Sequence, residues 1–120
     1  MSNLREIDRL IAEKVMGWDT EEFKNICIIR AYAEDEVISI PDDFCPSEDI
    51  KDAWVVVENL KREGTYLVVC PEKEKYAVNV WVDDGKDRCI PYTSVEADTA
   101  PMAICLVALK AVGVEVEVGE

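Results

Sequence analysis

Residues 98–113 read DTAPMAICLVALKAVG, and this stretch decides the fold. It begins and ends with the signals of a helix. Asp98 or Thr99 suits the N-cap, and Pro101 lies in the first turn, where its missing N–H costs nothing. Gly113 suits the left-handed position after the last turn. Only one residue between these ends is charged. Because a helix that is apolar on all sides is covered on more than one side, we expect a helix at the centre of the fold or one buried by another subunit.

The composition is that of a globular chain with an unusual charge. The sequence has 120 residues, of which 49% are hydrophobic and 32% charged, and we expect one domain spanning residues 1–120. Its net charge is −13 at pH 7. A field of this sign opposes DNA, RNA and anionic membranes, so we expect no nucleic-acid polymer and no membrane as partner. A phosphate ligand would need a local basic pocket.

The chain has no histidine and five cysteines. The lack of histidine removes Ser-His-Asp and Cys-His catalysis and most zinc sites. The cysteines are odd in number and form no C-x-x-C pair, which favours free structural thiols in a reduced compartment. The first residues resemble the start of an amphipathic helix and not a signal peptide, and no apolar run reaches membrane-spanning length. We therefore expect a protein of the cytoplasm.

Periodicity predicts an α+β fold with three helices and an antiparallel sheet. The expected elements are a helix over 4–16, strands over 26–29 and 37–40, a helix over 48–63, strands over 65–70, 76–82 and 88–95, and the closing helix. Their order is α-β-β-α-β-β-β-α. Pro41 places the second strand at an edge or ends it there.

The second helix has its own expected cap and core face. Ser47 is the expected N-cap, and Gly64 ends the helix. Helical spacing predicts one apolar stripe, formed by Ile50, Ala53, Trp54, Val57 and Leu60.

The strand over 76–83 alternates between two kinds of side chain. Asn79, Trp81 and Asp83 share one face with Ala77, opposite a face of valines and a tyrosine. An aromatic ring beside an amide and a carboxylate suits a nucleobase, through stacking on Trp81 and hydrogen bonds to its neighbours. The other interpretation is a solvated face, or one covered by a helix through Trp81.

Basic residues are few, so their positions matter. Arg30 and Arg88 lie in or beside strands and either clamp a phosphate or pair with neighbouring carboxylates. Lys110 lies late in the closing helix, where it either meets an anion or offsets the helix dipole. No acidic cluster has the spacing of a metal site, and no glycine-rich loop is present. We therefore expect a binding protein and not an enzyme, with no cofactor and no metal.

Three segments resemble one family in the same order. Residues 7–18 (IDRLIAEKVMGW), 46–60 (PSEDIKDAWVVVENL) and 97–113 (ADTAPMAICLVALKAVG) resemble the opening, second and closing helices of phage ABA-sandwich domains. These small proteins are encoded by phages and prophages. The resemblance implies an ABA-sandwich-like fold, self-association into a dimer or higher homo-oligomer, and a nucleotide pocket between subunits.

The same architecture is similar to the Thoeris anti-defence sponge proteins. Members of that family bind the cyclic ADP-ribose isomer made by host TIR-domain enzymes, and some hold cyclic oligonucleotides, without cleaving either. They place an arginine just after an Ala-Ile-Cys triplet and a basic residue one turn later. In this chain the first position is Leu106 and the second is Lys110.

Two functional hypotheses follow. In the leading one, the protein is a phage anti-defence sponge in the cytoplasm of the bacterial host, and it sequesters a cyclic-nucleotide immune signal. Trp81 would stack on a base, and Asn79 or Thr99 would hydrogen-bond. Phosphate would meet cations that oligomerisation brings together, namely Arg30, Arg88 and Lys110. The alternative is an acidic module that docks or inhibits a host protein and holds no small ligand.

Overall fold

The computed structural model describes residues 4–23, 28–33, 36–40, 43–83, 85–86 and 88–114. Its elements are α1 (Leu4–Leu10), the π-helical segment η1 (Ile11–Val15), β1 (Asp19–Phe23), β2 (Ile28–Tyr32), β3 (Val37–Ile40), α2 (Ile50–Arg62), β4 (Thr65–Pro71), β5 (Tyr76–Asp83), β6 (Cys89–Ala97) and α3 (Ala100–Ala111). The α+β prediction and its order of elements are confirmed. The structure adds β1, a strand that the sequence analysis did not predict, and residues 26 and 27 of the first predicted strand lie outside the described residues.

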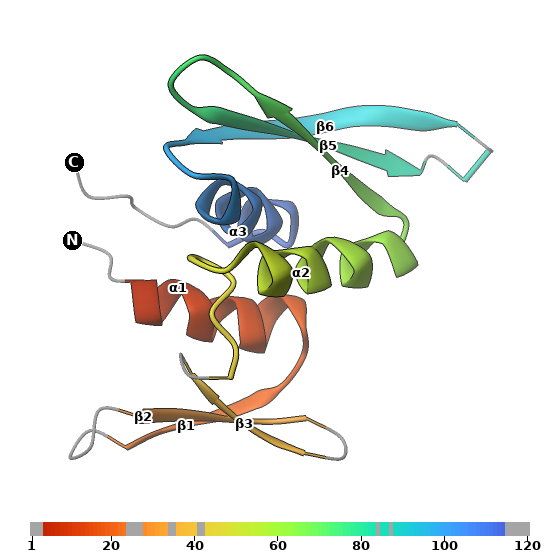
Figure 1. The fold of residues 1–120 in the computed structure, drawn as a ribbon. Helices are drawn as coiled ribbons and strands as arrows, with labels where there is room; N and C mark the ends of the chain where they lie inside the picture. The colour runs from red at the N-terminus through yellow and green to blue at the C-terminus, as the bar shows by residue number, and fades with distance from the viewer. Residues whose placement is uncertain are drawn as a thin grey trace.

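The helices form a layer between two antiparallel sheets (Figure 1). One sheet has the order β1-β2-β3 and the other β4-β5-β6. α1 and η1 contact the first sheet, whereas α2 and α3 contact the second. The sequence predicted a single antiparallel sheet, whereas the structure separates the strands into two sheets, one on each side of the helical layer, because no described strand of the first meander pairs with a strand of the second.

The first sheet covers one side of the helical layer. Its centre is β2, where Ile29 and Ala31 are buried, and β3 adds Ile38 and Ile40 to the same core cluster. β3 lies at the sheet edge and ends at Ile40, directly before the proline, as predicted. The opposite face of this sheet is exposed.

The second sheet places its central strand, β5, against α3. Val78 and Val80 are fully buried there, which confirms the alternation read from the sequence. The register of β5 and β6 shifts between Val80 and Trp81. Val80 pairs with Thr93 and Trp81 with Pro91, so one extra residue of β6 bulges out of the ladder.

α3 is the central helix of the fold. Thr99 is its N-cap, with the side-chain oxygen accepting from the N–H of Met102 at 3.3 Å. Every residue from Ala103 to Leu109 is buried, and these residues belong to both core clusters. Gly113 has φ of 86°, the left-handed conformation predicted for it. The sequence predicted either a central helix or one buried by another subunit. The structure shows the first, since other elements of the same chain bury α3.

α2 begins later than predicted and buries a different face. Asp49, not Ser47, is the N-cap, and its carboxylate accepts from the N–H of Lys51 at 2.9 Å. Ser47 lies two residues before this N-cap, in the turn that precedes the helix, where its N–H donates to the buried Asp8 carboxylate at 2.9 Å. The buried residues of α2 are Ala53, Val56, Val57 and Leu60.

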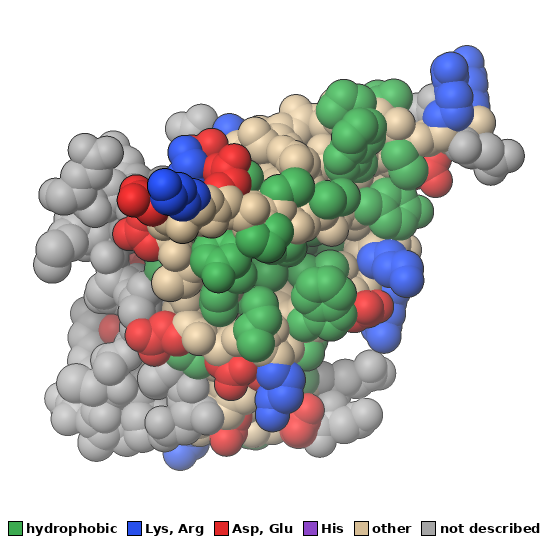
Figure 2. Space-filling view, turned by 45° about the horizontal axis from the view of Figure 1, so that its top comes forward, with side chains coloured by type: hydrophobic (Ala, Val, Ile, Leu, Met, Phe, Trp, Pro, Cys, Tyr) green, Lys and Arg blue, Asp and Glu red, His purple; other side chains and the backbone are tan. Residues whose placement is uncertain are grey.

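Two residues predicted for the apolar stripe of α2 are instead exposed. Ile50 is 51% exposed and Trp54 is 49% exposed. The buried stripe is therefore rotated about the helix axis relative to the predicted one. It includes Val56 and leaves out Ile50 and Trp54. Hydrophobic side chains accordingly gather in the middle of one face of the molecule, with charged groups around them (Figure 2).

Candidate functional site

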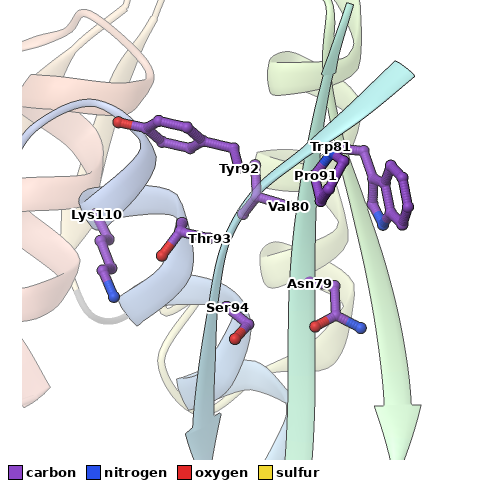
Figure 3. Close-up of a pocket in the computed structure, with 8 residues that line it drawn as sticks. All are labelled: Asn79, Val80, Trp81, Pro91, Tyr92, Thr93, Ser94 and Lys110. Carbon is purple, nitrogen blue, oxygen red and sulfur yellow. The ribbon is translucent and has the colours of Figure 1, made fainter. Parts of the chain in front are cut away.

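The candidate site is an open hollow of about 520 Å³ beside the edge strand β6. Residues of β5, β6 and α3 surround it (Figure 3). They are Asn79, Val80, Trp81, Pro91, Tyr92, Thr93, Ser94 and Lys110. Its size is within the range of pockets that hold small ligands.

The strand alternation of β5 places the first two polar and aromatic groups. Asn79 and Trp81 lie on the face of the sheet that points away from α3, since the intervening Val80 is buried against the helices. Figure 3 shows both side chains pointing to the same side of the strand. The Asn79 amide lies 3.6 Å from the Sγ of Cys70 on β4, to which it donates a weak hydrogen bond. This contact leaves the carbonyl oxygen of Asn79 as an acceptor for a ligand.

The bulge in β6 adds a second aromatic ring. Tyr92 is the extra residue between the paired positions Pro91 and Thr93, and its side chain is 57% exposed. In Figure 3 its ring points to the α3 side of β6, opposite to Trp81. A bulge commonly re-aims a side chain in this way at a functional site. The hollow therefore has an aromatic ring on each side of the β6 backbone.

Lys110 supplies the positive charge of the hollow. It lies in the last turn of α3 and is exposed, and it is the one charged residue among the eight that line the hollow. Thr93 lies on the same side of β6 as Lys110 in Figure 3. A cation beside a hydroxyl group can bind a phosphate or carboxylate oxygen with charge-assisted hydrogen bonds.

The six residues predicted for ligand binding fall into two groups. Asn79, Trp81 and Lys110 all line the hollow, the first two from the outer face of the sheet and Lys110 from the α3 side. Arg30 is exposed on β2, in the other sheet, and Arg88 is exposed just before β6 and does not line the hollow.

Thr99 belongs with the second group. As the N-cap of α3 it lies at the opposite end of that helix from Lys110, and its oxygen already accepts the Met102 N–H.

Sequence reasoning missed five of the eight residues of the hollow, namely Val80, which it placed on the opposite face of the strand, and four residues of β6. The four residues of β6 are Pro91, Tyr92, Thr93 and Ser94, in a predicted strand for which only Arg88 had been assigned a role in binding. One signal was present. A proline inside a strand indicates an edge position or a bulge, and Pro91 marks both.

A separate cluster of titratable groups is built for stability and not for nucleophilic chemistry. Cys45 donates its S–H to the buried Asp8 carboxylate, with 3.4 Å between Sγ and Oδ2. Burial, with the Asp8 charge next, raises the pKa of Cys45 to about 12. Burial also raises the pKa of Cys105, on α3. Because the thiolate is the nucleophile, these thiols are inert at neutral pH.

The remaining chemistry of the described residues is limited. The four cysteines among them (Cys45, Cys70, Cys89 and Cys105) are free thiols, and Cys27 lies outside them. Within that part of the chain, no group of three or more acidic or cysteine side chains could hold a metal ion. No helix in the same part is long and apolar enough to cross a membrane.

The architecture is an α+β domain in which helices lie between two antiparallel sheets, with an aromatic and polar hollow at one sheet edge. The family model described as phage ABA sandwich domain matches residues 9–109. The chain belongs to this family. No curated protein and no solved structure matches it.

Proposed function

We propose that this phage-family protein binds and sequesters a cyclic-nucleotide immune signal of the bacterial host, without cleaving it. The observation that carries the proposal is the composition of the hollow at β6. Two aromatic rings, an amide, two hydroxyl groups and one lysine are the groups that bind a base, a ribose and a phosphate. The resemblance to the Thoeris anti-defence sponges supports the same class of ligand.

Each group has a part in this proposal. The ring of Trp81 stacks on a base, and the Asn79 amide, on the same face of the sheet, hydrogen-bonds to the edge of that base. Thr93 and Ser94 bind ribose hydroxyl groups. Lys110 binds a phosphate. It thereby replaces the arginine that sponge proteins carry at the position of Leu106. Leu106 itself is 8% exposed and belongs to the core.

The charge of the chain fits a small ligand better than a polymer. With a net charge of −13, the surface repels an extended polyphosphate, whereas one lysine beside hydroxyl groups suffices for a single phosphate or pyrophosphate. The proposed place of action is the cytoplasm of the host, where such a signal accumulates.

The direct test is calorimetry of the purified protein with cyclic ADP-ribose isomers and cyclic dinucleotides. We expect one of these to bind, and we expect heat denaturation of the complex to release it with unchanged mass. A released product of different mass would make the protein an enzyme and contradict sequestration. If no member of either class binds, the proposal is wrong, and salt-sensitive capture of a basic host protein then tests the acidic docking module.

Matched variants locate the site. Trp81→Ala removes a stacking surface, for which the loss is about 1–3 kcal/mol, or roughly 5- to 150-fold in Kd. Trp54→Ala removes an exposed tryptophan from α2 and should leave ligand affinity unchanged. Lys110→Gln should weaken binding of the phosphate, whereas Lys73→Gln, on the exposed turn between β4 and β5, should not. Equal losses in Trp81→Ala and Trp54→Ala would place the ligand elsewhere.

A further inference from the structure

The outward face of α2 is apolar at its centre although the inward face of that helix is already buried. Trp54 is 49% exposed and Val55 is 44% exposed, in the middle of the helix. A shallow groove of about 250 Å³ runs along this face, lined by Met16, Lys51, Trp54, Val55, Glu58, Asn59 and Arg62. Large aromatic side chains dominate the energetics of interfaces, so an exposed tryptophan beside an apolar groove favours a role in binding a partner.

The charges around this centre belong to α2 itself. At about 100° per residue, Lys51, Glu58 and Arg62 fall within roughly 40° of one another on the helix surface. All three are exposed, and none of the salt bridges among the described residues uses them. They are therefore available to a partner.

This charge pattern is complementary to itself. Lys51 lies three residues before Trp54, and Glu58 lies three residues after Val55. When two α2 helices run antiparallel about a two-fold axis that passes between Trp54 and Val55, Lys51 of each copy lies opposite Glu58 of the other. Arg62 then faces the turn of the second copy that carries the exposed Glu48. Interfaces of two-fold dimers have this property, since each surface must complement itself.

The local charge also permits contact between two copies of so acidic a protein. α2 carries three basic residues (Lys51, Lys61 and Arg62) and two acidic ones (Asp52 and Glu58), so its net charge is +1, in a chain whose total is −13. A second copy that approaches through an acidic face is repelled more strongly than one that approaches through α2.

We propose that α2 is the self-association surface of this protein, and that a second copy of the chain packs antiparallel on Trp54 and Val55 with Lys51 paired to Glu58 across the interface. The two Trp54 rings lie side by side at the centre. The face of one helix is smaller than the roughly 800 Å² per partner of a standard interface, so we expect a dissociation constant in the micromolar range. This inference does not depend on nucleotide binding.

Sedimentation velocity over a range of protein concentrations tests the proposal. We expect a monomer–dimer equilibrium that Trp54→Ala weakens by about 30-fold or more, as for a residue at the centre of an interface. Lys51→Glu and Glu58→Lys should each weaken it by about tenfold, because each change creates two like-charge contacts.

The charge-swapped double variant gives the sharpest outcome. Lys51→Glu combined with Glu58→Lys restores both cross pairs, and we expect it to dimerise as the wild type does. Lys73→Glu, on the β4–β5 turn, changes the net charge by the same amount as Lys51→Glu alone and serves as the control for that variant. All of these side chains are exposed, and unchanged thermal unfolding confirms that each variant folds. A monomer at every concentration, or a dimer that Trp54→Ala leaves intact, or no recovery in the double variant, would overturn the proposal.

Discussion

The buried carboxylate of Asp8 makes a specific prediction about how the stability of this fold depends on pH. Asp8 is fully buried on α1 and joins that helix to the turn before α2. Its Oδ1 accepts from the N–H of Ser47 at 2.9 Å and its Oδ2 from the thiol of Cys45 at 3.4 Å. Burial raises the pKa of Asp8 above its ordinary value of 3.8, and the hydrogen bonds from Ser47 and Cys45 oppose this rise only in part.

Two substitutions separate the charge from the hydrogen bond. Asp8→Asn keeps an oxygen for the Ser47 N–H but cannot ionise. Asp8→Ala leaves that buried N–H without a partner, so it should be less stable than Asp8→Asn by about 1–3 kcal/mol at every pH.

The sign of the pH effect follows from the raised pKa. The folded state binds the proton more tightly than the unfolded state, so the contribution of Asp8 to stability is complete below pH 3.8 and is lost as pH rises through the folded-state pKa. Relative to Asp8→Asn, the wild type therefore becomes more stable on acidification, with a limiting slope of about 1.4 kcal/mol per pH unit.

The assay is urea unfolding of both proteins at several pH values from 4 to 7. The difference between the two unfolding free energies isolates Asp8 from the other acidic residues. A flat difference between wild type and Asp8→Asn, or one in which acid weakens the wild type relative to the variant, would refute the reasoning.

Three further predictions concern reactivity, core and cap. In the folded protein at pH 8, iodoacetamide should modify the exposed Cys89 and spare Cys45, because burial raises the pKa of Cys45 to about 12. Peptide mass mapping measures the labelling, and equal labelling of the two cysteines would contradict the assigned burial. Leu109→Ala should destabilise the fold by about 2–5 kcal/mol in denaturant unfolding, whereas Val112→Ala, at the exposed end of α3, should cost well under half of that. Thr99→Ala should cost about 0.5–2 kcal/mol through loss of the cap and leave ligand affinity unchanged; a selective loss of affinity would return Thr99 to the binding site.

Much of the fold was readable because its signals are local. The cap, proline and terminal glycine of α3 all lie within the helix or beside it, and the alternation of β5 needs only its own residues. β1 was missed because its sequence, DTEEF, has no apolar alternation, and it forms a strand by pairing with β2. The N-cap of α2 was misplaced because the chain around Ser47 forms a turn, tied to Asp8 39 residues away, and the helix begins only after that turn.

The candidate site was readable on one strand only. Asn79 and Trp81 share a face by strand periodicity, which the sequence shows directly. Lys110 lines the same hollow from the other side of β6, through the packing of α3 on β5 and β6, which no local pattern encodes. Tyr92 enters through a bulge whose position depends on the register between two strands. Contacts of this kind arise from tertiary structure and cannot be predicted from a local pattern. For the same reason the local pattern did not show that Arg30 lies in a different sheet from the hollow.

The placement of a helical layer between two meanders also has a consequence for how the molecule opens. Each sheet is built from strands that follow one another in the chain, and both rest on helices that contact each other directly. Either sheet can therefore detach without breaking a strand pair in the other. We expect amide hydrogen exchange to separate three cooperative units, with the short strands of β1–β3 exchanging first and the amides of α3 exchanging only on global unfolding. An insertion in the β1–β3 meander, or its exchange for the same meander of a related protein, would then leave the hollow on the β4–β6 sheet in place. The family could therefore diversify one face of the molecule while it preserves the opposite one.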